Sequence, residues 1–277
     1  MAQITAADVK ALRDKTQLPM MECKRALQET DGDQEAAIRL LREQGKKTMA
    51  KRADRATECG RIAIYVSLDP GVGSMVELQC ESAQVAVNDD FMQLAADLAT
   101  QLATGPGAET AEALWSQPSP SQPNRTLEQQ RDDLANRIRE VFRLERIIRV
   151  DKPCGGYVHH TGTDGVLLEI EGTNADIAKE VSMQVAAMKP QFVAKEDVPA
   201  EDVAKEREIL MTQARSEGKP ENIIEKMVEG RLRNFYAARV LLEQPFIKDE
   251  KQTVGAYAKG AGVRPIGFVH WQLGKGE

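Results

Sequence analysis

Two separated stretches of the chain repeat one order of predicted elements, and this repeat constrains the fold more than any other feature. Over 61–68 and 74–80 apolar and polar residues alternate, with an Asp-Pro-Gly-Val-Gly turn between the two stretches. The same order returns in Tyr157-Val-His-His, a turn containing glycine, and 166–170. A helical pattern follows each pair, so the sequence predicts a duplicated strand-strand-helix core and an α+β fold. The two helices are expected to begin near Asn88 and to span 174–188.

The first 45 residues carry the helical period instead of the strand period. A capped helix is expected over about 6–15, and a second helix begins at Pro19, which suits a first helical position. Asp33 is placed to cap a third helix, which is expected to stop near Gly45. The N-terminus therefore reads as a three-helix module of the ubiquitin-associated type.

The segments between these units differ in character. The stretch 46–55 is basic and is expected to be a solvated linker or a fraying helix end. Residues 104–125 are rich in Pro, Ser, Gly and Gln, which favours a flexible, exposed connection, and 127–144 then returns to a charged helical pattern.

The last third of the chain contains a second helical region. Over 198–236 two helical patterns flank a Gly-Lys-Pro turn and predict an inserted helical hairpin. The end of the chain offers a short helix and a strand around 265–273 that would close the second sheet. The expected divisions are 1–55, helical domain and linker; 56–152, first half of the core; 153–197, second half; 198–236, hairpin; and 237–277, return to the core and C-terminal strand.

Charge and cysteine usage argue against several classes of protein. The net charge of −6 and the pI of about 5.4 disfavour binding to duplex nucleic acid, which needs clustered Lys and Arg. No stretch approaches the roughly 18 apolar residues of a membrane span, and the N-terminus does not look like a transit peptide, so we expect a cytoplasmic protein. The four cysteines form no Cys-x-x-Cys pair, which favours reduced thiols over disulfides or a zinc ribbon. These are Cys23, Cys59, Cys80 and Cys154.

Motifs for catalysis are missing from the sequence. Gly45-Lys-Lys-Thr48 fails as a phosphate-binding loop because Leu40 stands where the first glycine belongs. Cys154, His159 and His160 are a weak metal grouping, because successive residues of a strand face opposite sides. The sequence therefore predicts a binding protein that is not an enzyme and that has no metal or cofactor.

Three stretches resemble the elongation factor Ts family, and together with the order of elements described above they cover nearly the whole chain. The N-terminal one is the most compact, with Leu12-Arg-Asp-Lys-Thr16 before Met20-Met-Glu-Cys-Lys-Arg-Ala-Leu27. The hairpin supplies Gly218-Lys-Pro220 and Glu225-Lys-Met-Val-Glu-Gly-Arg231, and the return to the core supplies Gln244-Pro-Phe246. The second half of the core supplies Tyr157-Val-His-His, Gly165-Val-Leu-Leu-Glu169 and Val185-Ala-Ala-Met-Lys-Pro190.

The resemblance implies a nucleotide exchange factor that binds elongation factor Tu, disturbs its magnesium and phosphate site and promotes GDP release during translation. The resemblance is also compatible with a homodimer of the factor, or with a dimer of the complex between the factor and elongation factor Tu. Neighbouring helical residues lie about 100° apart, so we expect one of Met20 and Met21 to face outward. The partner-binding residues that the resemblance implies are Lys10, Leu12, Met20, Met21, Lys24 and His159.

One element of the family pattern is altered in this sequence. The family has a Thr-Asp-Phe-Val segment after the second core strand, whose Phe wedges between helices of the partner and disturbs the magnesium site. The aligned residues here are Ser82, Ala83, Gln84 and Val85. An amide cannot replace a buried aromatic ring without a hydrogen-bonding partner, so this magnesium-dislocation segment is expected to act more weakly.

Two other functions fit parts of the sequence. The three-helix module could serve an adaptor that binds a ubiquitin-like or other helical partner, with the rest of the chain as scaffold. The basic stretch 46–55 could serve an RNA-binding factor, although the acidic net charge and the 4% aromatic content disfavour that interpretation. Neither alternative predicts an effect on GDP release.

Overall fold

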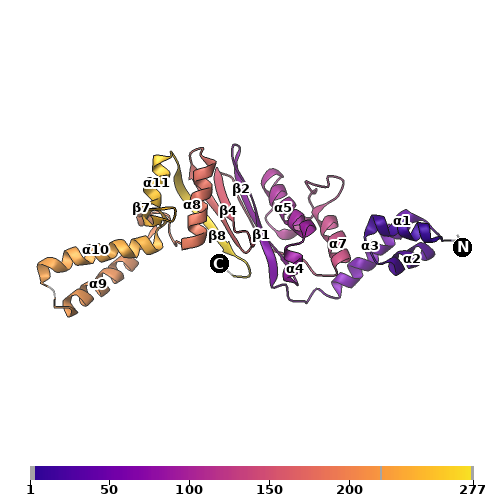
Figure 1. The fold of residues 1–277 in the computed structure, drawn as a ribbon, viewed down its shortest axis with the longest axis horizontal. Helices are drawn as coiled ribbons and strands as arrows, with labels where there is room; N and C mark the ends of the chain where they lie inside the picture. Colours follow the sequence, from indigo (N-terminus) through magenta and orange to yellow (C-terminus); the bar gives the residue numbers. More distant parts are fainter. Residues whose placement is uncertain (1–3, 219, 276–277) are drawn as a thin grey trace.

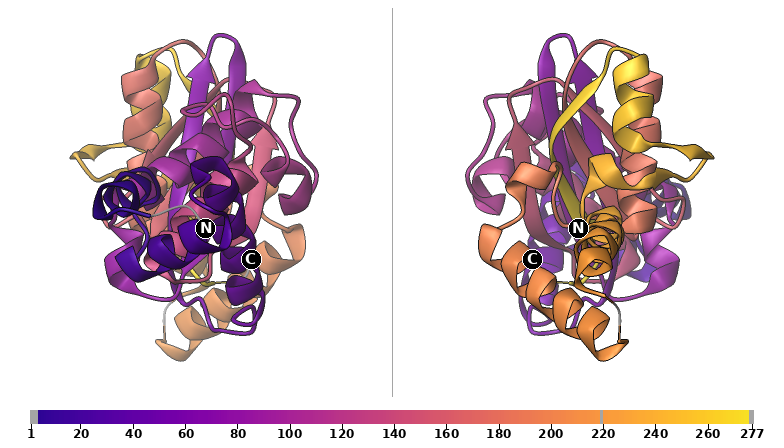
Figure 2. Two further views of the ribbon diagram at one scale, coloured as in Figure 1. Left: turned by 90° about the vertical axis from the view of Figure 1, so that its right-hand side faces the viewer. Right: turned by 90° about the vertical axis from the view of Figure 1, so that its left-hand side faces the viewer.

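The computed structural model describes residues 4–218 and 220–275. Its parts follow one another along the longest axis: three N-terminal helices at one end, two sheets with their helices in the middle, and a helical hairpin at the other end (Figure 1). The two end views bring the N-terminal helices and the hairpin to the front in turn (Figure 2). The predicted α+β class is confirmed.

The N-terminal module consists of α1 (Ala6–Thr16), α2 (Met20–Glu29) and α3 (Gln34–Ala50). A capping box between Thr5 and Asp8 starts α1, and the Asp33 side chain accepts hydrogen bonds from two amides at the start of α3. Pro19 is the residue before α2 and not its first residue. The module has its own apolar core, which includes Leu12, Leu27 and Leu41.

The expected end of the third helix at Gly45 is wrong, because α3 continues to Ala50. Gly45 is buried, and a Cβ on it would lie 2.6 Å from the side chain of Asn136. The glycine is therefore required by the close approach of a second helix and not by a change of backbone direction. That second helix is α7 (Leu127–Ile138).

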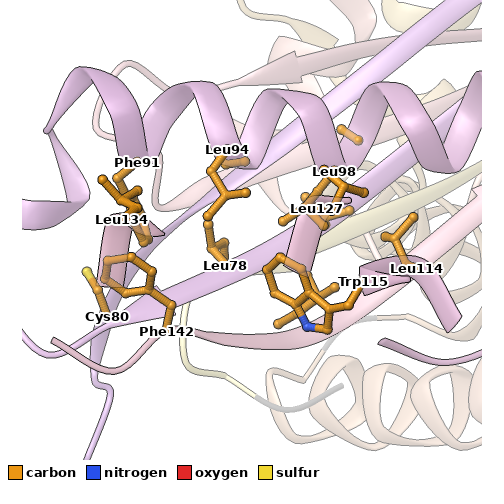
Figure 3. Packing of buried hydrophobic residues seen from close by; sticks show 14 of the residues in the cluster. Leu78, Cys80, Phe91, Leu94, Leu98, Leu114, Trp115, Leu127, Leu134 and Phe142 are labelled. Carbon is orange, nitrogen blue, oxygen red and sulfur yellow. The ribbon is translucent and has the colours of Figure 1, made fainter. Parts of the chain in front are cut away.

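The first half of the core is a three-stranded antiparallel sheet in the order β1-β2-β3. Its strands are β1 (Cys59–Leu68), β2 (Gly71–Cys80) and β3 (Arg143–Val150), and α5 (Asp89–Thr104), capped by Asn88 as expected, packs on β1 and β2. The apolar cluster between this helix and the sheet includes Leu78, Phe91, Leu94 and Leu98 (Figure 3). Phe91 and Phe142 meet edge to face within it.

Strand β3 is a correction to the expected helix over 127–144, since α7 ends at Ile138. The pairing with β2 shifts between Glu77 and Leu78, so Glu145 is an extra residue on β3. Leu144 and Ile147 consequently face the same cluster although they are three residues apart. This spacing resembles that of a helix and hides the strand.

The expected flexible connection over 104–125 is also wrong in part. It contains the short helix α6 (Ala111–Trp115), whose Leu114 and Trp115 are buried in the first core. Asp97, buried on α5, then accepts hydrogen bonds from Ser121 Oγ at 2.5 Å and from Gln130 Nε2 at 2.8 Å. The carboxylate holds the polar part of the segment against the helix.

The second half of the core repeats the topology of the first. Its sheet, β4-β5-β8, consists of β4 (Cys154–Val158), β5 (Asp164–Glu171) and β8 (Arg264–Gln272). The helix α8 (Ala175–Met188), capped by Asn174, packs on β4 and β5. The strand predicted around 265–273 therefore closes the second sheet, as expected. Each repeat has a third strand beyond the predicted strand-strand-helix unit.

The two sheets face each other in the middle of the molecule. Ile62 and Met75 from the first sheet meet Leu167 and Trp271 from the second. Gly165 is required at this interface, because a Cβ there would lie 2.4 Å from the Ile62 side chain. Each half thus buries one face of its sheet under a helix and the other against its repeat.

The inserted hairpin is formed by α9 (Ala200–Ser216) and α10 (Glu221–Arg239), and Lys219 of its turn lies outside the described residues. It has a separate apolar core that includes Leu210, Ala214, Ile224 and Val228. The remaining elements connect the hairpin to the second half of the core. They are the 3-10 turns η1 (Lys195–Asp197) and η2 (Leu241–Glu243), the strands β6 (Pro245–Phe246) and β7 (Asp249–Thr253), and the helix α11 (Val254–Gly260). Of these, η1 lies before the hairpin and the others follow it.

Candidate functional site

The N-terminal module presents two exposed methionines side by side. Met20 is 52% exposed and Met21 is 61% exposed, at the start of α2. We expected one of the two to face outward, and the structure exposes both. Lys24, one turn further along α2, and Lys10 on α1 are exposed as well. Exposed thioethers supply an adaptable apolar surface that a partner can cover at little cost in desolvation.

Leu12 does not belong to this surface. Its side chain is fully buried in the core of the module. The expectation that it contacts a partner is corrected to a structural role, because a side chain with no accessible surface cannot touch another molecule. Leu12 supports the exposed residues by packing α1 against α2 and α3.

The segment from Ser82 to Val85 forms a one-turn helix. This helix, α4 (Ala83–Ala86), is flanked by Ser82, its N-terminal capping residue, and by Val87. Ala83 and Gln84 are exposed, whereas Val85 is buried in the first core. Val85 therefore anchors the segment, and the surface that it offers comes from Gln84 and from Val87, which is 64% exposed.

Two glutamates hold the beginning of α4 in place. Glu140 accepts hydrogen bonds from the amides of Glu81 and Ser82, both at 3.1 Å, and from Ser82 Oγ at 2.6 Å. Glu81 in turn accepts from the Val141 amide at 2.9 Å and from Arg55 at 2.8 Å. Desolvation acts to raise the pKa of Glu81, but these two hydrogen bonds outweigh it and lower the pKa. The Glu81 carboxylate therefore stays ionised at neutral pH, and the hydrogen bonds of both glutamates fix the segment.

His159 lies just beyond the end of β4 and not within a strand, as we had expected. Its half-buried ring is 2.8 Å through Nδ1 from Thr161 Oγ1, and its amide donates to Asp164 O at 2.9 Å. The ring centroid of the neighbouring, exposed His160 is 4.1 Å away. The two imidazoles therefore lie side by side at the turn between β4 and β5, with His160 exposed and His159 half-buried.

Arg61 links this turn to α4. Its Nη1 donates to the carbonyl oxygen of Ala86 at 3.0 Å, while a Cβ on Gly162 would lie 3.0 Å from Arg61 Cβ. The next residue, Ile62, donates its amide to Gly162 O at 2.7 Å. Burial lowers the pKa of Arg61 from its ordinary value, although a guanidinium remains charged in proteins. The Ser82–Val85 segment and the His159 turn thus meet on the two sides of one half-buried arginine.

The N-terminal module is fixed to α7 by ion pairs. Arg42 binds Asp133 through Nε at 3.0 Å and Nη2 at 2.9 Å, and Arg139 binds Glu22 with contacts of 2.6 Å. A cavity of about 500 Å³ lies beside these contacts, between the module and the core. The exposed methionines therefore keep a defined position relative to the rest of the molecule.

The basic stretch 46–55 takes part in the same attachment. Lys46 contacts Asp132 at 3.1 Å, Arg52 donates to Arg139 O at 2.6 Å, and Arg55 binds Glu81. Of the two expectations for this stretch, the helix end is confirmed for 46–50, where α3 stops at Ala50, whereas the solvated linker is wrong because the stretch is docked on the core. Cations held by carboxylates and carbonyls are less available to phosphates, which weakens the RNA-binding alternative.

The potential metal grouping of the sequence does not assemble. Cys154 begins β4 and the two histidines follow its end, so the rise along the strand separates them by roughly 16 Å. Among the described residues, no three His, Cys, Asp or Glu side chains form a group that could hold a metal ion. Within the same residues, no helix has the length and apolar content needed to cross a membrane.

Comparison with known proteins gives one consistent family. The model of the family described as "Elongation factor TS" matches residues 81–275. A protein of Methylococcus capsulatus named elongation factor Ts is 42% identical over 276 residues, covering 99% of this chain and 93% of that protein. Proteins of the same name from Kineococcus radiotolerans and Prosthecochloris aestuarii are 41% and 42% identical, each covering 99% of this chain and 100% of the relative.

The chain belongs to the elongation factor Ts family. The resemblance noted in three short motifs is therefore confirmed over nearly the whole length. The elongation factor Ts model begins at Glu81, immediately before the altered segment, and the relatives extend the match through α1, α2 and α3.

Sequence patterns alone did not indicate three residues around the altered segment of this chain. Glu81 and Glu140 have no local signal, because the contact between them depends on the return of β3. Arg61 did have a signal, since it occupies the row of β1 that faces the helices, where Ala63 and Tyr65 are packed against the core. A charged residue in an otherwise apolar row indicates a specific partner.

Proposed function

We propose that this chain is a guanine nucleotide exchange factor that binds elongation factor Tu loaded with GDP, disturbs its magnesium and phosphate site and promotes GDP release in the cytoplasm during translation elongation. The observation that carries this proposal is the near-complete match in length to proteins named elongation factor Ts. It favours exchange over the adaptor and RNA-binding alternatives.

Exchange needs a difference in binding affinity and no chemical step. If the factor binds nucleotide-free partner more tightly than GDP-bound partner, linkage requires that it weaken GDP binding by the same factor. A coupling free energy of roughly 1–3 kcal/mol is typical of two such sites. The protein is accordingly proposed to act as a binding protein and not as an enzyme.

Two surfaces support a contact with one large partner. Met20, Met21, Lys10 and Lys24 lie at the end of the molecule formed by the N-terminal module, whereas α4 lies near the middle (Figure 1). The ion pairs between α3 and α7 hold the two surfaces at a fixed separation. We assign the first surface to affinity, because it is apolar and cationic, and the second to displacement of the nucleotide.

The second surface combines the α4 segment with His159. Gln84 on α4 and Val87 just after it are exposed, and Arg61 connects α4 to the histidine turn. The hydrogen bonds of Glu140 and Glu81 hold the start of α4 and resist displacement of Gln84 when a partner contacts it. This support makes α4 a stiff projection, which is what displacing a bound ion or phosphate from a partner requires.

A kinetic experiment tests the proposal directly. Elongation factor Tu is loaded with N-methylanthraniloyl-GDP and mixed in a stopped-flow instrument with excess unlabelled GDP, with and without this protein. The protein is expected to accelerate the loss of fluorescence at concentrations below that of the partner, because it is released after each exchange. An unchanged release rate, together with equal affinity for GDP-bound and nucleotide-free partner, would overturn the proposal.

The oligomeric state remains a prediction. Sedimentation of the free protein and of its complex with nucleotide-free elongation factor Tu separates a monomer, a homodimer and a dimer of complexes. The exchange proposal holds for each of these states, because the linkage argument applies per binding site.

A further inference from the structure

Two free cysteines lie directly opposite each other at one end of the first sheet. Cys59, the first residue of β1, is paired with Cys80, the last residue of β2. Directly paired residues of antiparallel strands have Cα atoms about 4.5 or 5.5 Å apart and side chains on the same face. Disulfides span Cα separations of roughly 4.4–6.8 Å, so this pairing already satisfies the backbone requirement.

The surroundings of the pair give the two sulfurs different roles. Cys80 is fully buried at the end of the first core, close to Phe142 (Figure 3), whereas Cys59 is half-buried against the same cluster. A dissolved oxidant therefore reaches Cys59 first. Desolvation, with smaller contributions from Glu140 and Cys59, raises the pKa of Cys80 to about 12, so Cys80 is a protonated thiol at neutral pH and a poor initial nucleophile.

A glycine beside the pair allows the two strands to lie close together. Gly60 follows Cys59 with φ of 153°, and a Cβ on it would lie 2.3 Å from Leu78 O. Glycine has more accessible backbone conformations than other residues. Gly60 therefore lets β1 approach β2 closely at the position next to Cys59, which keeps Cys59 directly opposite Cys80.

The other two cysteines have no such arrangement. Cys23 is buried in the core of the N-terminal module, and Cys154 is paired across the second sheet with Glu169. Both serve as internal references for reactivity, because they are buried thiols in the same chain with no cysteine opposite them.

We propose that Cys59 and Cys80 form a reversible disulfide when the protein meets a peroxide. In the first step the Cys59 thiolate attacks hydrogen peroxide: an S–O bond forms, the O–O bond breaks, and hydroxide leaves and takes up a proton as water. In the second step the Cys80 sulfur attacks the Cys59 sulfenic acid: the S–S bond forms, the S–O bond breaks, and the leaving hydroxide takes the Cys80 proton as water. Two thiols and one peroxide thus give one disulfide and two waters, with sulfur oxidised and the peroxide oxygen reduced.

Oxidation acts on the beginning of α4. In the reduced protein Cys80 Sγ lies 3.2 Å from the carbonyl oxygen of Ser82 and donates its proton to it. A disulfide has no proton to donate, so this contact is lost just before the Ser82–Val85 segment. Its effect on GDP release rests on the proposed function, and we expect the oxidised protein to exchange more slowly than the reduced one.

Peptide mapping of the full chain tests the disulfide without reference to exchange. The protein is treated with hydrogen peroxide, blocked with N-ethylmaleimide, digested and analysed by mass spectrometry. We expect one linked pair of peptides, containing Cys59 and Cys80, that dithiothreitol separates. Cys154→Ser should retain this pair, and Cys59→Ser, which changes a half-buried side chain, should lose it.

Three results would overturn the inference: oxidation of Cys59 that stops at sulfenic or sulfinic acid, a disulfide between other cysteines, or four thiols that all remain free. GDP release by the oxidised protein is then measured on the same sample. A disulfide without any change in release would refute the coupling to α4, while failure of the reduced protein to accelerate release would refute the proposed function alone.

Discussion

Arg146 on β3 binds Glu77, a wholly buried carboxylate on β2, through Nε at 3.0 Å and Nη2 at 2.5 Å. The same guanidinium stacks on Trp271 at 4.5 Å and donates to Gln272 O at 3.0 Å, both at the end of β8. One buried ion pair therefore joins the first sheet to the closing strand of the second sheet.

Replacing Arg146 should destabilise both halves together. Arg146→Met leaves the Glu77 charge buried without its partner, which costs about 3–5 kcal/mol in the free energy of unfolding. Urea unfolding followed by circular dichroism measures this change. The control is Arg264→Met, which breaks an exposed ion pair with Glu171 and should cost about 0–1 kcal/mol. Equal losses for the two variants would contradict the role assigned to Arg146.

Gly45→Ala should destabilise the attachment of the N-terminal module, although alanine is the better helix former. The new methyl group would meet the Asn136 side chain at 2.6 Å. Gly230→Ala on α10 is the matched control, because nothing lies within 4 Å of that position, and it should stabilise by roughly 0.5–1 kcal/mol. Thermal unfolding distinguishes the two, and Gly45→Ala combined with Asn136→Ala should recover part of the loss.

Met20→Ala with Met21→Ala should weaken binding to elongation factor Tu without lowering stability, because both side chains are exposed. The concentration needed for half-maximal acceleration of GDP release should rise roughly tenfold, which corresponds to ~1.4 kcal/mol. Leu12→Ala should behave in the opposite way. It should cost about 2–5 kcal/mol of stability through the cavity that it leaves. A double methionine variant with normal affinity would remove this surface from the proposed site.

Gln84→Phe should accelerate GDP release, because an aromatic ring restores the apolar wedge that the family pattern has at this position. Burial of such a ring contributes roughly 1.5–3 kcal/mol, so a gain of roughly 4- to 13-fold is expected if half of that appears in the transition state. Gln191→Phe, at another exposed glutamine, controls for added apolar surface. A gain with both variants, or with neither, would contradict a specific role for α4.

Alkaline pH should destabilise the protein through two buried thiols. Burial raises the pKa of Cys80 to about 12 and that of Cys154 to about 11, from 9.0. Below pH 9 both thiols are protonated in the folded and unfolded chains, so they add no pH dependence. Above pH 9 the unfolded chain releases these protons and the folded chain keeps them, so the free energy of unfolding falls as pH rises through 9 towards 11. Urea unfolding at several pH values should show a smaller fall for Cys154→Ala, and an equal fall would contradict this explanation.

Sequence patterns predicted the parts of the fold that local chemistry determines. Asn88 and Asn174 cap helices where the helical period begins, and the alternating stretches became β1, β2 and β5. The predicted helix end at Gly45 was wrong, because in the sequence a glycine required by a neighbouring helix looks the same as a glycine that ends a helix. Strand β3 was hidden by the extra residue Glu145, which places Leu144 and Ile147 at a helical spacing on one face.

The candidate site was predictable only for residues whose proposed role depends on an exposed side chain and not on a contact with a distant part of the chain. Met20, Met21 and Gln84 are exposed, in agreement with a surface role, but Leu12 and Val85 are buried. Their burial was not predicted, because motif matching does not distinguish the inward face of a short helix from its outward face. Arg61 and Glu140 act through partners that are distant in the sequence, such as Ala86 and Ser82. Their roles follow from the way that the strands return and could not be inferred from spacing.

The closing strand of the second sheet comes from the end of the chain. Until β8 has been synthesised, β5 presents an unpaired edge and Trp271 is missing from the space between the sheets. The edge of β5 therefore stays unpaired while the ribosome synthesises the entire hairpin, and the nascent protein is prone to aggregation during this period. We therefore expect a chain that ends a few residues before Arg264 to retain nearly all of its helices but to fail to reach the native state.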